Sequence, residues 1–268
     1  MKLLVQSDDF GITPAVSLGI IEAIKNGIVR NTGLFANMTW ADECVEMIKP
    51  YLDKISFGID LNMSAGPPVL PVDKVPGLVQ KNGLFLTSAM NRALDTDENN
   101  HDHVVYEEVY QEFDAQIQKY IKLVGKAPDY IHGHAYGTRT TWRIMEELAQ
   151  KYRRPFTSSI LWDKRMKSGN MEWYRFGNNM QDQFQDDVKA CILEDRMGYL
   201  NAEYGNIVTH CGYMDMKLLE YSSYTVYRIK DLEAMTSPEV KDWVKKNQIE
   251  LITYKDLEDW STVRWEAK

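Results

Sequence analysis

The chain opens with Met1-Lys2-Leu3-Leu4-Val5-Gln6-Ser7-Asp8-Asp9-Phe10-Gly11-Ile12-Thr13-Pro14, and this stretch decides the fold class. Its apolar start predicts a buried strand over residues 1–6, with two adjacent aspartates where that strand ends. The threonine and proline that follow are placed as the N-cap and first residue of a helix. A strand, an acidic turn and a helix form the βα unit of an α/β protein, whose chemistry lies at the carboxyl ends of its strands. We expect Asp8 and Asp9 to lie in a functional site, although acids at such a turn can also simply cap the helix.

Strand-like and helix-like segments alternate along all 268 residues. Further strands are predicted at 33–36, 55–59, 130–131, 156–161, 206–210 and 249–253. Helices are predicted at 41–49, 104–124, 140–152, 183–197 and 238–246. The segment 62–101, rich in proline and glycine, is expected to be a long irregular loop that covers or lines a site. The alternation favours one parallel-stranded α/β domain over residues 1–268, and among such folds a barrel.

Composition excludes several classes of function. The formal net charge is −8 and no basic block stands out, so we expect neither nucleic acid nor a membrane as a partner. Three cysteines are too few and too far apart for a disulfide framework or a thiolate zinc site, which indicates reduced thiols. The amino terminus lacks a signal-peptide core, and no apolar run reaches the roughly 18 residues of a membrane span. We therefore expect a cytoplasmic protein.

Three of the five histidines fall at predicted strand ends, as do three aspartates. His132 and His134 form a His-x-His pair, which places both rings on one face of a strand. In a barrel, one mouth would collect the following side chains: Asp8, Asp9, Asp60, His132, His134 and His210. Carboxylate and imidazole ligands suit zinc, magnesium or manganese. With a carboxylate as base and a histidine as acid, the predicted chemistry is metal-assisted hydrolysis, although a histidine at such a place often only packs or hydrogen-bonds.

Three segments carry a family resemblance. Gln6-Ser7-Asp8-Asp9-Phe10-Gly11 matches an Asn-Ala-Asp-Asp-Phe-Gly motif, and the segment from Pro128 to Tyr136 matches Pro-x-x-x-Asp-x-His-x-His. His210-Cys211-Gly212-Tyr213-Met214-Asp215 matches His-Pro-Gly-Tyr-x-Asp. In this order the motifs resemble those of the YdjC/ChbG family of carbohydrate deacetylases, over roughly residues 1–257. The resemblance implies a TIM-barrel-like fold with an incomplete strand set.

The resemblance also implies an activity and roles for particular residues. The expected reaction is the hydrolysis of an N-acetyl group from an amino sugar or a chito-oligosaccharide, phosphorylated or not, with release of acetate. By position, Asp9 and His134 would bind a divalent metal ion and Asp8 would be the general base. His210 would lie near the leaving amine or help to stabilise the intermediate. An enzyme of this size and type is commonly a homodimer.

Two departures from the family pattern concern the metal site. Asp60 stands where the family has a metal-binding histidine, while His132 replaces an aspartate and Tyr136 replaces the second histidine of the pair. Either Asp60 takes over as a ligand, or His132 fills the vacancy, or the site has lost its metal. An oxygen ligand at Asp60 would favour magnesium over zinc, with manganese as a further alternative.

Three alternatives for function remain open at this stage. The first is the metal-dependent deacetylase, and the second is a non-catalytic carbohydrate-binding or regulatory barrel that has lost its metal. The third is hydrolysis of another acyl or phosphoryl group by the same site. Arginines that could grip a substrate phosphate are Arg92, Arg139, Arg143 and Arg165, and tryptophans that could stack on sugar rings are Trp142, Trp162 and Trp173.

Overall fold

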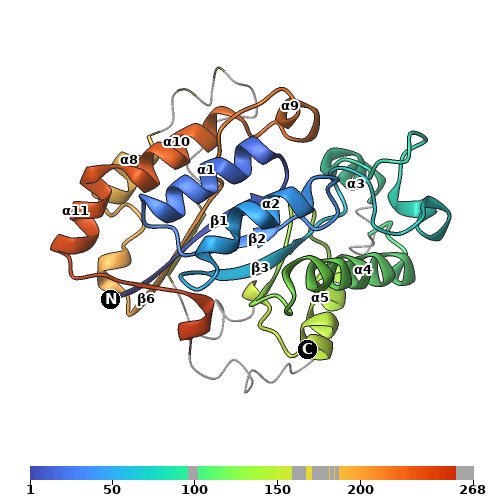
Figure 1. Ribbon diagram of the computed structural model, residues 1–268, viewed down its shortest axis with the longest axis horizontal. Coiled ribbons are helices and arrows are strands. Elements are labelled where there is room, and N and C mark those ends of the chain that lie inside the picture. Colours follow the sequence, from blue (N-terminus) through green and yellow to red (C-terminus); the bar gives the residue numbers. More distant parts are fainter. Residues whose placement is uncertain (96–101, 159–166, 171–180, 182–183, 185–186, 258–268) are drawn as a thin grey trace.

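The computed structural model of the chain describes residues 1–95, 102–158, 167–170, 181, 184 and 187–257. Its seven described strands form one sheet in which paired strands run parallel (Figure 1). In chain order they are β1 Lys2–Phe10, β2 Asn31–Leu34, β3 Ser56–Leu61, β4 Ile131–Gly133, β5 Lys167–Asn170, β6 Tyr204–Thr209 and β7 Glu250–Ile252.

Strand β1 lies at the centre of this sheet. The strand order is β4-β3-β2-β1-β6-β5, and β7 also pairs with β1. On one edge, β1 pairs with β6 over Lys2–Ser7. On its other edge, β1 pairs with β7 through its residues 2–4 and with β2 through its residues 6–10. Among the described residues these pairings do not close a ring, and a bridge from Ile131 to Phe156 continues the pairing beyond β4. The expected α/β class with an incomplete, barrel-like strand set is confirmed.

Helices cover one face of the sheet in the same order as the strands they connect. They are α1 Pro14–Lys25, α2 Ala41–Ile48, α3 Ser88–Leu94, α4 Tyr106–Val124, α5 Arg139–Tyr152, α8 Val188–Leu193, α9 Leu218–Tyr221, α10 Val226–Thr236 and α11 Pro238–Lys246. Figure 1 shows α8, α10, α1 and α2 side by side over the strands, and α1 contacts both α10 and α2. Helix α1 begins as its sequence predicts: the Thr13 side chain accepts a hydrogen bond from the Val16 amide, and Pro14 is the first helical residue.

The side chains of β1 alternate between two apolar clusters. Leu3 and Val5 belong to the large core that also contains the buried faces of the helices. Leu4 belongs instead to a small cluster on the opposite face, with Tyr130, Ile252, Tyr254 and Leu257. Period-two alternation in a strand explains this division. The face of the sheet turned away from the helices, called the inner face from here on, therefore has its own small apolar floor.

Most predicted elements are confirmed within a few residues, but several differ. The first strand does not end at residue 6 but runs through the acidic pair to Phe10. The segment 62–101 contains helix α3 and two short 3-10 helices at 72–74 and 76–78, so it is more ordered than an irregular loop. The helix expected over 183–197 is helical only at 188–193 in the described part, and neither α10 nor β5 was predicted.

The strand expected at 156–161 is wrong in its described part. Only Phe156 forms a β-bridge, residues 157–158 are helical, and residues 159–161 lie outside the described residues. No helix in the described part is both long and apolar enough to cross a bilayer.

Candidate active site

A break in the pairing of β1 places both aspartates of the opening motif in one site. The register between β1 and β2 shifts between Ser7 and Phe10, and Asp9 has a φ of 69°. In a regular strand two consecutive side chains point to opposite faces. Here both carboxylates contact histidines at the end of β4. Asp8 Oδ2 lies 3.4 Å from His132 Nε2, and Asp9 Oδ1 lies 2.8 Å from Nδ1 of His134, the residue after β4. The predicted strand-end acids and the His-x-His pair therefore form two neighbouring acid–imidazole pairs.

The first of these pairs is ionic at neutral pH. Burial by itself lowers the pKa of His132, but the charge and hydrogen bond of Asp8, together with the charges of Asp60 and Asp9, outweigh it and raise that pKa to about 9. Burial raises the pKa of Asp8, but the charge and hydrogen bond of His132, the charge of His210 and the hydrogen bond from Gln6 together outweigh it, so the Asp8 pKa lies below its ordinary value. The other ring nitrogen of His132 hydrogen-bonds Thr157 Oγ1 at 2.6 Å, which fixes the orientation of the ring. The sequence left open whether His132 fills the vacant ligand position or only forms hydrogen bonds, and the structure makes it the partner of Asp8.

Asp9 is held by a second cation that the sequence analysis missed. Arg228 of α10 donates from one Nη to Asp9 Oδ2 at 2.6 Å, and each of these side chains is 1% exposed. The Arg228 Nε donates to the Tyr224 carbonyl at 2.9 Å, which anchors the guanidinium. Burial would raise the pKa of Asp9, but the charges of His134 and Arg228 keep it well below its ordinary range.

One sequence signal could have identified Arg228. With Asp231, Leu232 and Met235 it falls at helical spacing on the buried stripe of α10. Two charged residues on an otherwise apolar stripe need partners in the interior. Because the sequence did not predict α10, it did not indicate these interior partners.

Asp60, on β3, contacts the acidic pair through the backbone of Asp9. It is fully buried, and its Oδ2 accepts a hydrogen bond of 2.8 Å from the backbone amide of Asp9. Its Oδ1 has no hydrogen-bond partner among the described residues. Burial raises the pKa of Asp60 well above its ordinary value, and the charges of Asp8 and Asp9 add to the rise. Gly33 of β2 leaves room for the carboxyl group, because a Cβ atom there would lie 1.9 Å from Oδ1.

His210 follows the end of β6 and completes the group of predicted residues. Its backbone amide donates to Asp231 Oδ2 at 2.7 Å, and its ring lies 4.7 Å from that of Tyr224, measured between centroids. Its charge lowers the pKa values of both Asp8 and Asp9, although less than their partner histidines do, so the ring lies near both. The five residues chosen from the sequence, Asp8, Asp9, Asp60, His134 and His210, therefore converge at the carboxyl ends of β1, β3, β4 and β6.

A chain of hydrogen bonds through Tyr254, Gln6 and Asp8, called the polar ladder from here on, connects the site to the small apolar cluster of the inner face. Tyr254 donates its hydroxyl to Gln6 Oε1 at 2.7 Å, and the Gln6 amide group donates to Asp8 Oδ1. Gln6 lies two residues before Asp8 on β1 and two after Leu4, so the three side chains share one face. This ladder orients the Asp8 carboxylate from below, and no sequence motif indicated it.

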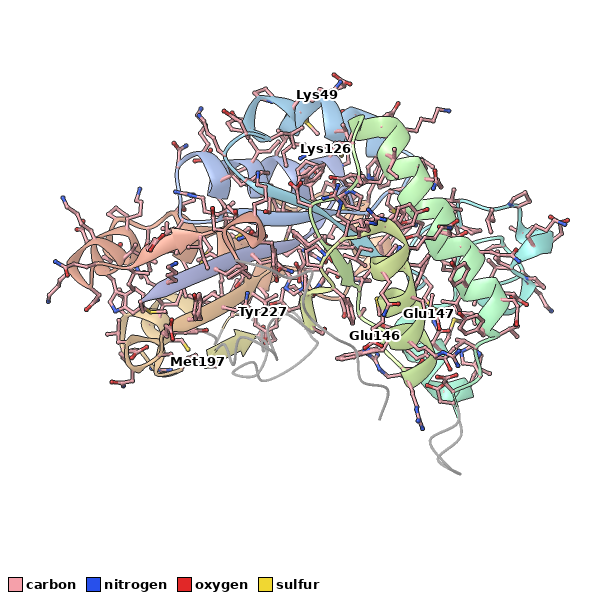
Figure 2. The ribbon with its side chains drawn as sticks, turned by 90° about the horizontal axis from the view of Figure 1, so that it is seen from below. Lys49, Lys126, Glu146, Glu147, Met197 and Tyr227 are labelled. Carbon is pink, nitrogen blue, oxygen red and sulfur yellow. The ribbon has the colours of Figure 1, made fainter. Side chains whose placement is uncertain are left out.

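The other residues singled out from the sequence lie away from these acids. Tyr136 donates its hydroxyl to Asp95 at 2.7 Å, and Arg143 forms an exposed ion pair with Glu147 of α5, which is labelled in Figure 2. Arg92 donates to the Ala135 carbonyl at 2.7 Å, one residue beyond His134, so it alone of the described arginines from the sequence is tied to the His134 loop. Trp162, Arg165 and Trp173 lie outside the described residues. Arg139 and Trp142 lie on α5, where the Trp142 ring packs on that of Phe156 with centroids 5.9 Å apart.

The donor atoms for a metal ion are present, but they are not assembled as a complete set. The 2.8 Å between Asp9 Oδ1 and His134 Nδ1 is a direct hydrogen-bond distance, and it brings together a carboxylate and an imidazole, both of which are zinc ligand types. The buried Asp60 Oδ1 without a partner is an acceptor that a cation could satisfy. Within the described part of the chain, however, no group of three or more His, Cys, Asp or Glu side chains is placed to hold an ion.

Comparisons with known proteins agree with the motifs. The family model described as YdjC-like protein matches residues 2–246. Carbohydrate deacetylases of Clostridium beijerinckii and of Enterococcus faecalis strain V583 are each 31% identical to the chain, over 265 and 271 residues. The alignments cover 96% of this chain in both cases, and 100% and 98% of those proteins. The resemblance inferred from the three motifs is confirmed.

Solved structures agree with the fold. The crystal structure of an E. faecalis V583 protein, described as a candidate for cellobiose-phosphate cleavage, superposes with a TM-score of 0.75 at 27% identity. The superposition covers 95% of this chain and 97% of that one. A mutant of the peptidoglycan deacetylase PdaC from Bacillus subtilis superposes with a TM-score of 0.51 at 13% identity, covering 96% and 89% of the two chains. This second likeness concerns the fold alone.

Proposed function

The chain belongs to the YdjC-like protein family, and from that premise we propose that it is a metal-dependent carbohydrate deacetylase. It removes an N-acetyl group from an amino sugar or a chito-oligosaccharide, phosphorylated or not, and releases acetate. The observation that carries the proposal is the paired arrangement of Asp8 with His132 and of Asp9 with His134, at the carboxyl ends of the strands. The carbohydrate deacetylases to which the chain is similar over nearly its whole length support the substrate class.

Asp8 is the general base of this proposal. The pKa of Asp8 is lowered because the histidine charges and hydrogen bonds around it together outweigh burial, and its carboxylate is therefore ionised at neutral pH. A water molecule attacks the acetyl carbonyl carbon while Asp8 takes its proton. The C–N bond of the amide then breaks, and the amine nitrogen of the sugar takes a proton as it leaves. His210, whose charge is felt by both aspartates, is the residue proposed to deliver that proton.

Asp9 and His134 are the residues proposed to hold a divalent ion, with Asp60 as the third ligand. The contact between Asp9 and His134 and the partnerless buried Oδ1 of Asp60 fit such an ion. Two carboxylates among three ligands favour magnesium, with zinc and manganese as alternatives. When bound, the ion would polarise the acetyl carbonyl.

The substrate's phosphate, where there is one, would bind at Arg92. One Nη of its guanidinium donates a hydrogen bond to the carbonyl of Ala135, which follows His134, and the Arg92 side chain is exposed. An exposed arginine near the mouth of the site can donate hydrogen bonds to phosphate oxygens.

The test is acetate release from purified protein. After treatment with a chelator, the protein is assayed with N-acetylglucosamine and N-acetylated chito-oligosaccharides, with and without a phosphate group, in magnesium, zinc or manganese. We expect acetate only when an ion is added, and phosphate release is measured in parallel to detect hydrolysis of another group. Absence of acetate with every sugar and every ion would contradict the proposal.

A second candidate function is a carbohydrate-binding barrel without catalysis. Two observations favour it: Arg228 already occupies Asp9 Oδ2, and the described residues hold no assembled three-ligand group. Metal content after dialysis, measured by mass spectrometry, separates the two candidates. The binding protein would carry no divalent ion and would bind the sugar by calorimetry without releasing acetate.

A further inference from the structure

The backbone of Asp9 has a conformation that a non-glycine residue adopts only when its surroundings hold it. Its φ of 69° lies in the left-handed region, inside a strand rather than at a turn. The register between β1 and β2 shifts at the same place. This local irregularity allows the Asp8 and Asp9 side chains to reach β4 together, so the geometry of the acidic pair depends on it.

Asp60 makes the contact that holds this conformation. Its Oδ2 accepts the Asp9 amide hydrogen at 2.8 Å, and both residues are buried. A buried backbone amide must find an acceptor, and at an irregular point of a strand the neighbouring strand does not supply one. The carboxyl group fits there because the facing position on β2 is Gly33, where a Cβ atom would lie 1.9 Å from Oδ1.

We infer that Asp60 is a positioning residue: it fixes the left-handed Asp9 through its backbone amide and thereby keeps Asp8 and Asp9 in one site. The consequence for catalysis rests on the proposed function, whereas the contact itself can be tested without any activity. This role uses Oδ2 and is separate from a ligand role, which would use the partnerless Oδ1. It also gives a reason for an aspartate rather than a histidine at this position, because a carboxylate oxygen accepts the amide hydrogen in any protonation state.

The test compares Asp60→Asn with Asp60→Leu in the metal-free protein. Asparagine keeps a side-chain oxygen that can accept the Asp9 amide hydrogen, and leucine has a similar size without an acceptor. Hydrogen exchange at the Asp9 amide, followed by NMR, should be on the order of 10- to 100-fold faster in Asp60→Leu and within about threefold of the parent in Asp60→Asn. The His134 amide, which donates to the Leu61 carbonyl at 3.0 Å, reports whether the strands have opened more widely.

A variant at Gly33 perturbs the same contact and leaves Asp60 in place. In Gly33→Ala the new Cβ would push the carboxyl group away, and Asp9 exchange should again accelerate while exchange at His134 changes less. Unchanged Asp9 exchange in Asp60→Leu, or an equal acceleration in Asp60→Asn and Asp60→Leu, would overturn the inference. These outcomes do not depend on whether the parent protein releases acetate.

If the parent protein is active, the same pair of variants gives a catalytic result. Asp60→Leu should lose at least about tenfold more turnover than Asp60→Asn, because both variants remove the proposed carboxylate ligand but only leucine also releases the Asp9 amide and displaces the reacting groups. If Asp60→Asn loses ion affinity but keeps the Asp9 amide protected, Asp60 is a ligand in addition, and its positioning role stands. Full turnover in Asp60→Leu would overturn the role.

Discussion

The two faces of the sheet differ in what they contribute, although alternate residues of the same strands form both. On the face covered by helices, Leu3 and Val5 of β1 join one continuous apolar core. On the inner face, Leu4 belongs to a five-residue cluster, and above it Gln6 and Asp8 form hydrogen bonds and ion pairs. The helix-covered face therefore supplies most of the hydrophobic stabilisation, and the inner face holds charged groups that are costly to bury unless paired. Changes on the two faces should affect different properties.

The largest effect on activity is expected from Asp8→Asn on the inner face. Removing the general base should lower kcat by about 10²- to 10⁴-fold. The measurement is the rate of acetate release at saturating substrate, and Asp42→Asn on the exposed side of α2 is the matched control. Unaltered turnover in Asp8→Asn would mean that another group takes the proton.

The largest effect on stability without a loss of activity is expected from Leu3→Ala on the helix-covered face. Leu3 is fully buried, and truncation should lower the free energy of unfolding by about 2–5 kcal/mol through lost burial and a cavity. Urea denaturation measures this change. The control is Leu18→Ala on the exposed side of α1, whose free energy of unfolding should stay within about 0.5 kcal/mol of the parent. If the folded Leu3→Ala protein lost turnover as strongly as Asp8→Asn, the division between the faces would be wrong.

A smaller effect concerns pH and the pair of His132 with Asp8. The pKa of His132 is raised from 6.5 to about 9, because the contacts with Asp8 and the charges of Asp60 and Asp9 together outweigh burial. Its contribution to stability is therefore complete below about pH 6.5. That contribution is lost as the pH rises through about 9. In metal-free protein we expect stability on the order of 2 kcal/mol to disappear over this range, a figure reduced for the partly exposed ring. The variant His132→Gln should flatten this dependence in urea denaturation at a series of pH values, and a parallel slope in the variant would contradict the assignment.

The smallest effect on stability is expected from Tyr254→Phe, at the end of the polar ladder farthest from Asp8. This change removes the hydroxyl that binds Gln6 Oε1 and should cost about 1 kcal/mol, measured by thermal or urea unfolding. Tyr130 packs against Tyr254 with ring centroids 4.4 Å apart, and its own hydroxyl has no hydrogen-bond partner among the described residues. Tyr130→Phe is therefore the matched control and should cost less than Tyr254→Phe. The reverse order would show that the ladder does not orient the inner face.

The sequence predicted most of the fold because its signals are local. The apolar run before Asp8, the Thr13-Pro14 helix start and the period of the long helix α4 each follow from neighbouring residues. The sequence predicted an irregular segment 62–101 because prolines and glycines interrupt its pattern, yet α3 forms there, with contacts from Asn91 to His103 and from Arg92 to the Ala135 carbonyl. Helix α10 was missed because buried polar residues interrupt its apolar periodicity.

Residue types at strand ends, together with three motifs, were enough to choose Asp8, Asp9, Asp60, His134 and His210 from the sequence. Only the tertiary structure decided how they are paired. Arg228 lies 219 positions from Asp9 and Tyr254 lies 248 from Gln6, so no local pattern connects them. The left-handed backbone conformation of Asp9 and the space that Gly33 leaves for Asp60 depend on the packing of β1, β2 and β3 against one another. The physical reason is that sequence periodicity reports which face a side chain occupies, whereas charge pairing and backbone strain depend on contacts that form only when distant segments pack together.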